Sequence, residues 1–171
     1  MKRQVIRIVN IAKRPCLHAC ILPAGVPVST AQTLTISATG DNTVDIFHDA
    51  AIVQHDSWWG SAVTAPLPGD TCVLALTATN NGGAGGLLAS TSTGVVTDET
   101  WKCSGTEQQG WHLEEFNDTC WSSAHVVAQY GDGPWGAISG ISGNAKWIWD
   151  IGYVEYTVAT TYCRKTICVG Q

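Results

Sequence analysis

Charged side chains are scarce in this sequence, and basic ones are the scarcest. Lysine and arginine number 9 and aspartate and glutamate 14, so charged residues form 13% of the chain, against about a quarter in average proteins. The one basic cluster lies within residues 1–14, where alternating apolar residues favour a strand with one solvated face. A net charge of -5 without a further basic patch argues against a nucleic-acid partner.

Long apolar runs are also lacking. No stretch approaches the roughly 18 apolar residues of a membrane-spanning helix, so we expect no insertion into a membrane. Arg7 and Asn10 interrupt the apolar run that a signal peptide would need. We therefore expect this to be a mature chain, with Met1, its only methionine, added in front of a processed N-terminus.

Recognisable catalytic motifs are missing as well. There is no GxSxG, HExxH or phosphate-binding GKS/GKT sequence. Residues 131–136 match GxGxxG, but no helix pattern follows, so we interpret them as a tight loop. A glycosidase needs two carboxylates about 5–10 Å apart, for which Asp49 with Asp56, or Glu114 with Glu115, are the nominal candidates. We predict that the protein is not an enzyme.

Cysteines, in contrast, are numerous: there are seven. Cys16, His18 and Cys20 could begin a zinc site, but the spacing is unusual for one, and this many cysteines is typical of disulfides in an oxidising compartment. A glycosylation sequon at Asn117 agrees with that compartment. We therefore predict a secreted, extracellular protein. Cys72, within an apolar segment, is our candidate for a buried free thiol.

Short segments of β-branched or alternating residues recur along the chain, separated by glycine, proline and asparagine turns. The segment from 107 to 118 is the best helix candidate, but Gly110 and the lack of an apolar stripe limit it to a turn or two. The glycine-rich tract 80–86 indicates a bulge or a tight crossing. We predict one all-β domain over residues 1–171, with strands at 4–11, 32–38, 43–48, 72–79, 124–129, 145–149 and 153–162.

Eight tryptophans form two groups. Four lie in or beside strand-like segments and are expected in the core: Trp101, Trp121, Trp147 and Trp149. The other four lie in loops beside polar residues or glycine: Trp58, Trp59, Trp111 and Trp135. Exposed aromatic rings beside carboxylates, amides and imidazoles are what sugars require, because sugars have an apolar face and many hydroxyls. Residues 54–60 have that mixture, although a packed loop with Trp59 covering the end of the domain is an equal interpretation.

The order of motifs from residue 40 onward resembles the galactose-binding-domain-like jelly rolls of extracellular animal proteins and of glycosidase accessory domains. The resembling pieces are DNTVDIFHD (41–49), LPGDTCVLALTATNNGGAGGLLAS (67–90), TDETWKCS (97–104), GWHLEEFNDTCW (110–121), YGDGPWG (130–136), NAKWIW (144–149) and TYCRKT (161–166). With this resemblance, we predict a single antiparallel β-sandwich of jelly-roll topology, built from about eight to ten strands, with the N-terminal strand inside the domain.

The same resemblance implies a Cys103–Cys163 disulfide, and we add a bridge from Cys16 or Cys20 to Cys120 or Cys168. Some members hold a structural calcium, to which Asp41, Asp70 or Asp132 could contribute here, although we assign no cofactor.

The function that the resemblance implies is that of a lectin, a non-catalytic module binding glycans or glycoproteins, with an adhesive or matrix module as the alternative. The site is expected where the loops 48–60, 80–86 and 131–136 meet, and it consists of His55, Asp56, Trp58, Asn81, Asp132 and Trp135. Replacing Trp58 and Trp135 together should abolish binding without affecting the fold. Single-site affinity is expected to be weak, so we predict a homo-oligomer.

Overall fold

The computed structural model describes residues 33–168, and these residues form eleven strands and no helix. No segment of this part is therefore a helix able to cross a membrane. The strands are β1 (Leu34–Asp41), β2 (Thr43–His48), β3 (Ala51–Asp56), β4 (Val63–Leu67), β5 (Val73–Asn81), β6 (Gly86–Thr91), β7 (Lys102–Ser104), β8 (Ser122–Ser123), β9 (His125–Gln129), β10 (Lys146–Trp149) and β11 (Val158–Thr166).

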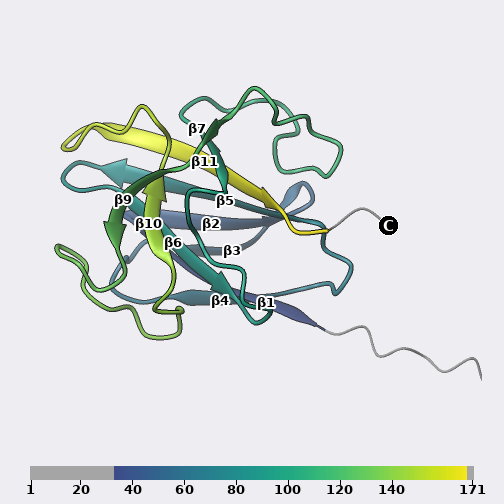
Figure 1. Cartoon of the computed structure of the whole chain (residues 1–171), viewed down its shortest axis with the longest axis horizontal. Coiled ribbons are helices and arrows are strands. Elements are labelled where there is room, and N and C mark those ends of the chain that lie inside the picture. Colours follow the sequence, from purple (N-terminus) through teal and green to yellow (C-terminus); the bar gives the residue numbers. More distant parts are fainter. Residues whose placement is uncertain (1–32, 169–171) are drawn as a thin grey trace, which may run out of the picture. The chain divides into compact units, whose positions relative to one another are not determined.

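The strands form two antiparallel sheets that face each other (Figure 1). Sheet A has the strand order β4-β1-β6-β10-β9, and sheet B has the order β3-β2-β5-β11-β7-β8. The longest pairing joins β11 to β5 over nine residues, from Val158 opposite Asn81 to Thr166 opposite Val73. The predicted all-β sandwich is confirmed, with one strand more than the expected range. The strand predicted at 4–11 lies outside the described residues.

The main core lies between the sheets, where strands alternate inward apolar and outward polar residues. Leu34, Ile36 and Ala38 of β1 point into this core together with Leu87 and Ala89 of β6. Leu88, between the last two, belongs instead to a second cluster on the outer face of sheet A. Burial on both faces explains why β6 has a continuous apolar pattern rather than an alternating one.

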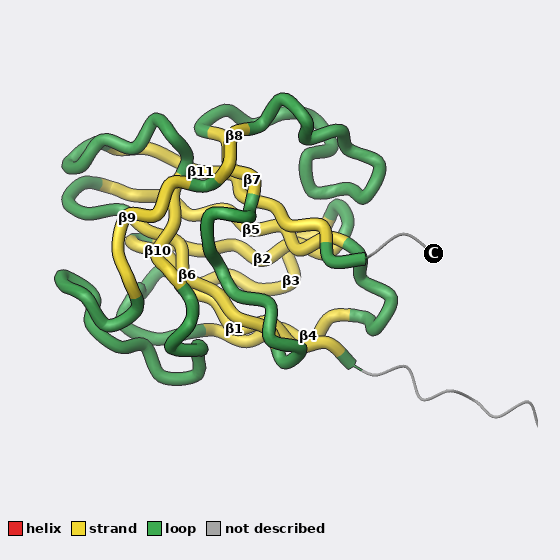
Figure 2. Tube along the Cα trace, viewed as in Figure 1, coloured by secondary structure: helices red, strands yellow, loops and turns green. Residues whose placement is uncertain are grey.

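Two long loops, the green segments between β7 and β8 and between β9 and β10 in Figure 2, each pack on part of the outer face of a sheet. The β9–β10 loop places Trp135, Ile138 and Ile141 in the cluster with Leu88 of sheet A. The β7–β8 loop packs on sheet B, with Trp111, Trp121, Val73 and Ala75 in a third cluster. Each sheet is thus buried on its inner side and over part of its outer side.

These covering loops decide which tryptophans are buried. The four expected in the core are buried, as predicted. Trp111 and Trp135, expected among exposed loop residues, are only 1% and 6% exposed. Their sequence neighbourhood is that of a loop, but the loops fold back over the sheets, so the indoles fill the outer clusters.

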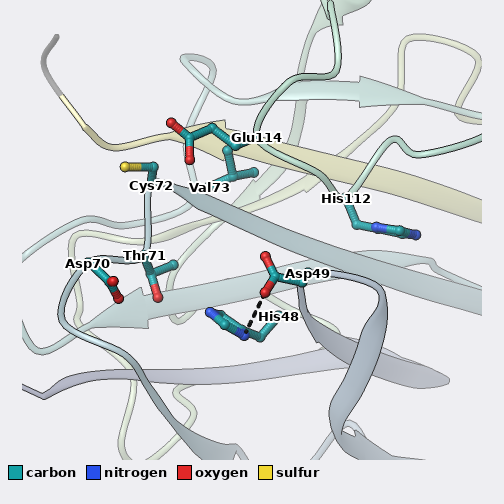
Figure 3. Close-up of a pocket in the computed structure, with 8 residues that line it drawn as sticks. All are labelled: His48, Asp49, Asp70, Thr71, Cys72, Val73, His112 and Glu114. Carbon is teal, nitrogen blue, oxygen red and sulfur yellow. Dashed lines mark ion pairs between the residues drawn. The ribbon is translucent and has the colours of Figure 1, made fainter. Parts of the chain in front are cut away.

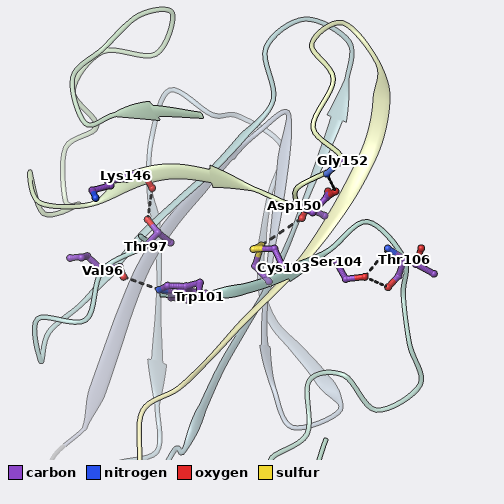
Figure 4. Close-up of a disulfide and its surroundings, with 11 residues drawn as sticks. Val96, Thr97, Trp101, Cys103, Ser104, Thr106, Lys146, Asp150 and Gly152 are labelled. Carbon is purple, nitrogen blue, oxygen red and sulfur yellow. Dashed lines mark hydrogen bonds between the residues drawn. A yellow bond between two sulfur atoms is a disulfide. The ribbon is translucent and has the colours of Figure 1, made fainter. Parts of the chain in front are cut away.

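The described residues contain two disulfides. Cys103 of β7 and Cys163 of β11 are directly opposite residues of neighbouring strands, and they are bonded as the resemblance implied (Figure 4). Cys72 is bonded to Cys168, so the prediction of a free thiol at Cys72 is wrong. The apolar segment that suggested a thiol begins one residue after Cys72, which lies at the strand end beside the end of β11.

The second bridge removes Cys168 from the predicted pairings with Cys16 or Cys20, which lie outside the described residues. Cys120 is exposed in the β7–β8 loop and has no disulfide partner among the described cysteines.

Candidate functional site

The three loops that were expected to form the site do not all lie together over their whole length. β1, β3 and β5 end, and β6 and β11 begin, at one end of the sandwich, which we call the loop end. In Figure 1 this end lies at the left, and β11 ends at the right. The loop 48–60 does not lie there as a whole, because 51–56 form strand β3. Its first turn, at His48 and Asp49, therefore lies at the opposite end.

A buried asparagine organises the loop end. Asn80, 1% exposed, donates from Nδ2 to the carbonyls of Gly83 (3.2 Å) and Thr157 (3.0 Å), and its Oδ1 accepts the Gly82 N–H (3.0 Å). These three bonds join the glycine-rich loop to the β10–β11 loop. Sequence reasoning selected the neighbouring Asn81 and overlooked Asn80, since both lie in the same polar, glycine-rich stretch and only burial distinguishes them.

Asn42 connects the next strand to this arrangement. Its side-chain Oδ1 accepts the Asn81 N–H at 2.6 Å, and its own N–H donates to the Thr79 carbonyl at 2.6 Å. The exposed Asn81, a predicted site residue, therefore has its backbone fixed and its amide side chain at the surface. Such an amide can donate to and accept from a ligand hydroxyl.

Trp58 is exposed at the same end but is held in place. It follows β3, its side chain is 61% exposed, and its ring stacks on Trp59 with centroids 5.6 Å apart. Gly60 also lies close to the ring, since a Cβ atom added there would lie 2.7 Å from Trp58 Nε1. Trp59 is half-buried against the outer cluster of sheet A, and its carbonyl accepts the Thr39 hydroxyl at 2.9 Å. The expectation that Trp59 packs at the end of the domain agrees with this position.

Trp135 is buried beneath the loop end and does not lie on its surface. Its ring stacks on Trp147 at 4.3 Å, and Nε1 donates to Asp41 Oδ2 at 2.8 Å. It therefore has no free face for a sugar, and the expectation that it is an exposed loop residue outside the core is wrong. Burial raises the pKa of the Asp41 carboxyl, and the hydrogen bond from Trp135 offsets part of that rise.

The other predicted polar residues are engaged within the protein. His55 Nδ1 lies 2.6 Å from Asp45 Oδ1, across the β2–β3 pair. Asp56 accepts the Ser57 N–H at 2.7 Å, and Asp132 accepts the Gln129 N–H at 3.2 Å. Each of these groups keeps a solvent-facing part, so each can still bond to a ligand.

The carboxylates considered for calcium do not form one site. Asp41 is buried under Trp135, Asp70 lies in the turn before β5 at the opposite end, and Asp132 closes its own turn. The described residues contain no cluster of three or more His, Cys, Asp or Glu side chains that could hold a metal ion. Since calcium needs six to eight oxygens, these three aspartates do not fit a shared ion.

A polar pocket of about 200 Å³ lies at the opposite end from the loop end (Figure 3). It was not predicted, because its walls come from three separate turns. His48 and Asp49 pair at 3.6 Å, and the remaining lining residues are Asp70, Thr71, Cys72, Val73, His112 and Glu114. No cationic side chain other than histidine lines it, so the pocket does not suit an anionic ligand.

The predicted glycosylation residue, Asn117, is exposed in the β7–β8 loop. Its Oδ1 accepts the Thr119 N–H at 3.1 Å. The amide nitrogen to which a glycan would attach has no hydrogen bond within the protein described here.

Comparison with known proteins places these features in context. An α-L-rhamnosidase of Streptomyces avermitilis is 32% identical over 136 residues. The chain resembles one part of a glycoside hydrolase. The aligned part is 68% of this chain but only 13% of that enzyme. The similarity agrees with the glycosidase side of the resemblance stated above and gives no support for an animal family. No protein-family model and no solved structure matches the chain.

Proposed function

We propose that this chain is a non-catalytic carbohydrate-binding module, and that it binds glycans at the loop end. The observation that carries the proposal is Trp58, which alone among the eight tryptophans is exposed. Leaving a large apolar ring in water gives no stability to the fold, and bracing by Trp59 and Gly60 reduces the entropy lost when a ligand stacks on it. A sugar's apolar face is the partner that such a ring suits.

The similarity to a rhamnosidase supports the choice of ligand class. A segment that corresponds to 13% of that enzyme is the size of one domain, so the greater part of that enzyme lies outside the similarity. α-L-Rhamnosides are therefore the first sugars to test. We also propose that the protein acts outside the cell, with which the two disulfides are compatible, and that several copies assemble to increase avidity.

A glycan array that includes α-L-rhamnosides tests this function. We expect saturable binding to a restricted set, and a loss of about tenfold or more in Trp58→Ala, because the ring contributes both contact area and stacking. Glu115→Gln, an exposed change in the β7–β8 loop, is the matched control and should bind as the parent does.

Two other results would reject the proposal. Binding to a glycoprotein that persists after its glycans are removed would indicate the adhesive alternative. Hydrolysis of 4-nitrophenyl α-L-rhamnopyranoside would indicate an enzyme, and the polar pocket is where we would then look for the carboxylates. Asp49→Asn and Glu114→Gln should in that case remove the activity.

A further inference from the structure

The β10–β11 loop exposes several large apolar side chains beside the glycine-rich loop. Ile151, Val154 and Tyr156 of this loop, and Val158 at the start of β11, are between 59% and 77% exposed. The loop itself is fixed, because Asn80 bonds the Thr157 carbonyl and the Tyr153 hydroxyl accepts the Gly85 N–H at 3.1 Å. A fixed loop presents its side chains to a partner without the cost of ordering it.

Tyr156 is the residue of this loop that the fold explains least. Its N–H donates to the Gly83 carbonyl at 2.7 Å, and its backbone is left-handed, with φ of 64°. Glycine and asparagine adopt that conformation more readily than a bulky aromatic residue does. The ring is 77% exposed, so packing does not account for it either. Neither the local backbone nor the core requires a tyrosine at this position.

Tyr156 and Trp58 flank the same row of strand ends. Trp58 follows β3, and Tyr156 precedes β11 by two residues, with β2 and β5 between them in sheet B. Three strand spacings of about 4.8 Å separate the two outer strands by roughly 14 Å. Asn42 and Asn81 lie at the strand ends between them. Above Gly82 and Gly83, a Cβ atom would meet nothing within 4 Å, so the space over this loop is open.

We propose that Tyr156 is a second aromatic contact of the site at Trp58, and that the ligand is an oligosaccharide of at least two sugar units. Because the strands next to these two residues are roughly 14 Å apart, one sugar ring would be too short to reach both aromatic residues, whereas a short chain would pass over Asn81 and the open glycine loop. The inference rests on the proposed function and adds to it the length of the ligand. It makes Tyr156 a residue that selects glycan length.

The test compares the parent chain with Tyr156→Asn and Trp58→Ala on an array printed with monosaccharides and with oligosaccharides built from them, α-L-rhamnosides included. Asparagine tolerates the left-handed backbone, so Tyr156→Asn should melt no lower than the parent. We expect it to lose roughly three- to tenfold in affinity for oligosaccharides and none for monosaccharides. Trp58→Ala should lose affinity for both monosaccharides and oligosaccharides. Val154→Ala, an exposed change in the same loop, should match the parent.

The other outcomes overturn the inference in distinguishable ways. If Tyr156→Asn binds every glycan as the parent does, Tyr156 is not part of the site, and the proposed function stands. If the variant loses affinity for monosaccharides and oligosaccharides equally, both aromatic rings contact the same sugar unit, and the proposed minimum length of two units is wrong. If the parent chain binds no glycan, the proposed function fails and the inference fails with it.

Discussion

Arg164 of β11 and Asp118 of the β7–β8 loop form an ion pair in which the arginine is almost fully buried. The side chain of Arg164 is 1% exposed and that of Asp118 is 24% exposed. Arg164 also donates to the carbonyls of Phe116 at 3.2 Å and Leu113 at 2.9 Å. One guanidinium therefore fastens a long loop without regular structure to the sheet beneath it.

Asp118→Asn should destabilise the protein by about 2–4 kcal/mol, because it leaves a buried guanidinium without its counter-charge. Urea unfolding followed by tryptophan fluorescence measures the change. Glu115→Gln, an exposed change in the same loop, should leave the free energy of unfolding within about 0.5 kcal/mol of the parent value. Equal stability of the two variants would mean that the ion pair does not hold the loop.

Trp58→Ala should affect glycan binding, whereas Trp135→Ala should affect the stability of the fold. Removing Trp58 should reduce glycan affinity and leave the melting temperature nearly unchanged, because its ring is exposed. Removing Trp135 should cost about 3–5 kcal/mol, since it leaves a cavity against Trp147 and an unpaired Asp41 carboxylate. Thermal unfolding and glycan binding, measured on both variants, check this. A stable Trp135→Ala chain would contradict the position assigned to that ring.

Asp41 should make stability depend on pH in the acid range. Burial raises its pKa above the ordinary 3.8, so the folded state binds a proton that the unfolded state has already released. The free energy of unfolding should therefore fall as the pH rises from about that ordinary value through the raised folded value, and this contribution should be constant above it. Asp41→Asn keeps an acceptor for Trp135 and removes the titration. Relative to that variant, the parent should become less stable as the pH rises; the opposite slope would reject the assignment.

Peptide mapping should divide the five cysteines of residues 33–168 into two bridged pairs and Cys120. Without reduction, we expect the Cys72–Cys168 and Cys103–Cys163 bridges, and Cys120 in neither of them. The bridges span 96 and 60 residues, so the loss of either should cost about 4–5 kcal/mol through the entropy of the unfolded chain. Recovery of Cys72 as an alkylated thiol would show that the first bridge is absent.

Gly86→Ala should destabilise the loop end. An added Cβ atom would lie 2.7 Å from the Trp147 ring and 3.1 Å from that of Trp135, and neither ring can withdraw from a packed cluster. We expect a cost of about 1–3 kcal/mol. Gly133→Ala, where a Cβ atom meets nothing within 4 Å, is the control and should melt close to the parent temperature.

The sequence predicted the strands whose residues alternate or are strongly β-branched. Those expected at 32–38, 43–48, 72–79, 124–129 and 145–149 overlap β1, β2, β5, β9 and β10. β4 was missed because Pro66 lies within it, which an edge strand tolerates. The strand expected at 153–162 begins only at Val158, because the preceding residues bond to the glycine-rich loop instead of to a neighbouring strand.

The candidate site was harder to predict than the strands, for a physical reason. Exposure of a loop residue depends on what the loop packs against, and that partner is distant in the sequence. Trp58 and Trp135 have similar neighbours along the chain, yet one is free and the other stacks on Trp147. The turn at His48 and Asp49 was predicted at the loop end because residues 48–60 were taken as one loop. No turn residues in this stretch indicate that 51–56 form strand β3, which places the turn at the opposite end.

The covering loops also constrain which glycan architectures the protein could recognise. Because the loops that carry Trp111 and Trp121 on one sheet and Trp135 on the other pack on the outer sheet surfaces, they interrupt any broad flat platform of the kind that would lie along a crystalline polysaccharide. Under the proposed function, the ligand instead lies across the loop end, and the last few sugar units of a chain suffice to reach from Trp58 to Tyr156. Branch ends and the termini of soluble chains would then be favoured over the long flanks of packed fibres, and a short side chain on a polysaccharide would be a better target than its backbone.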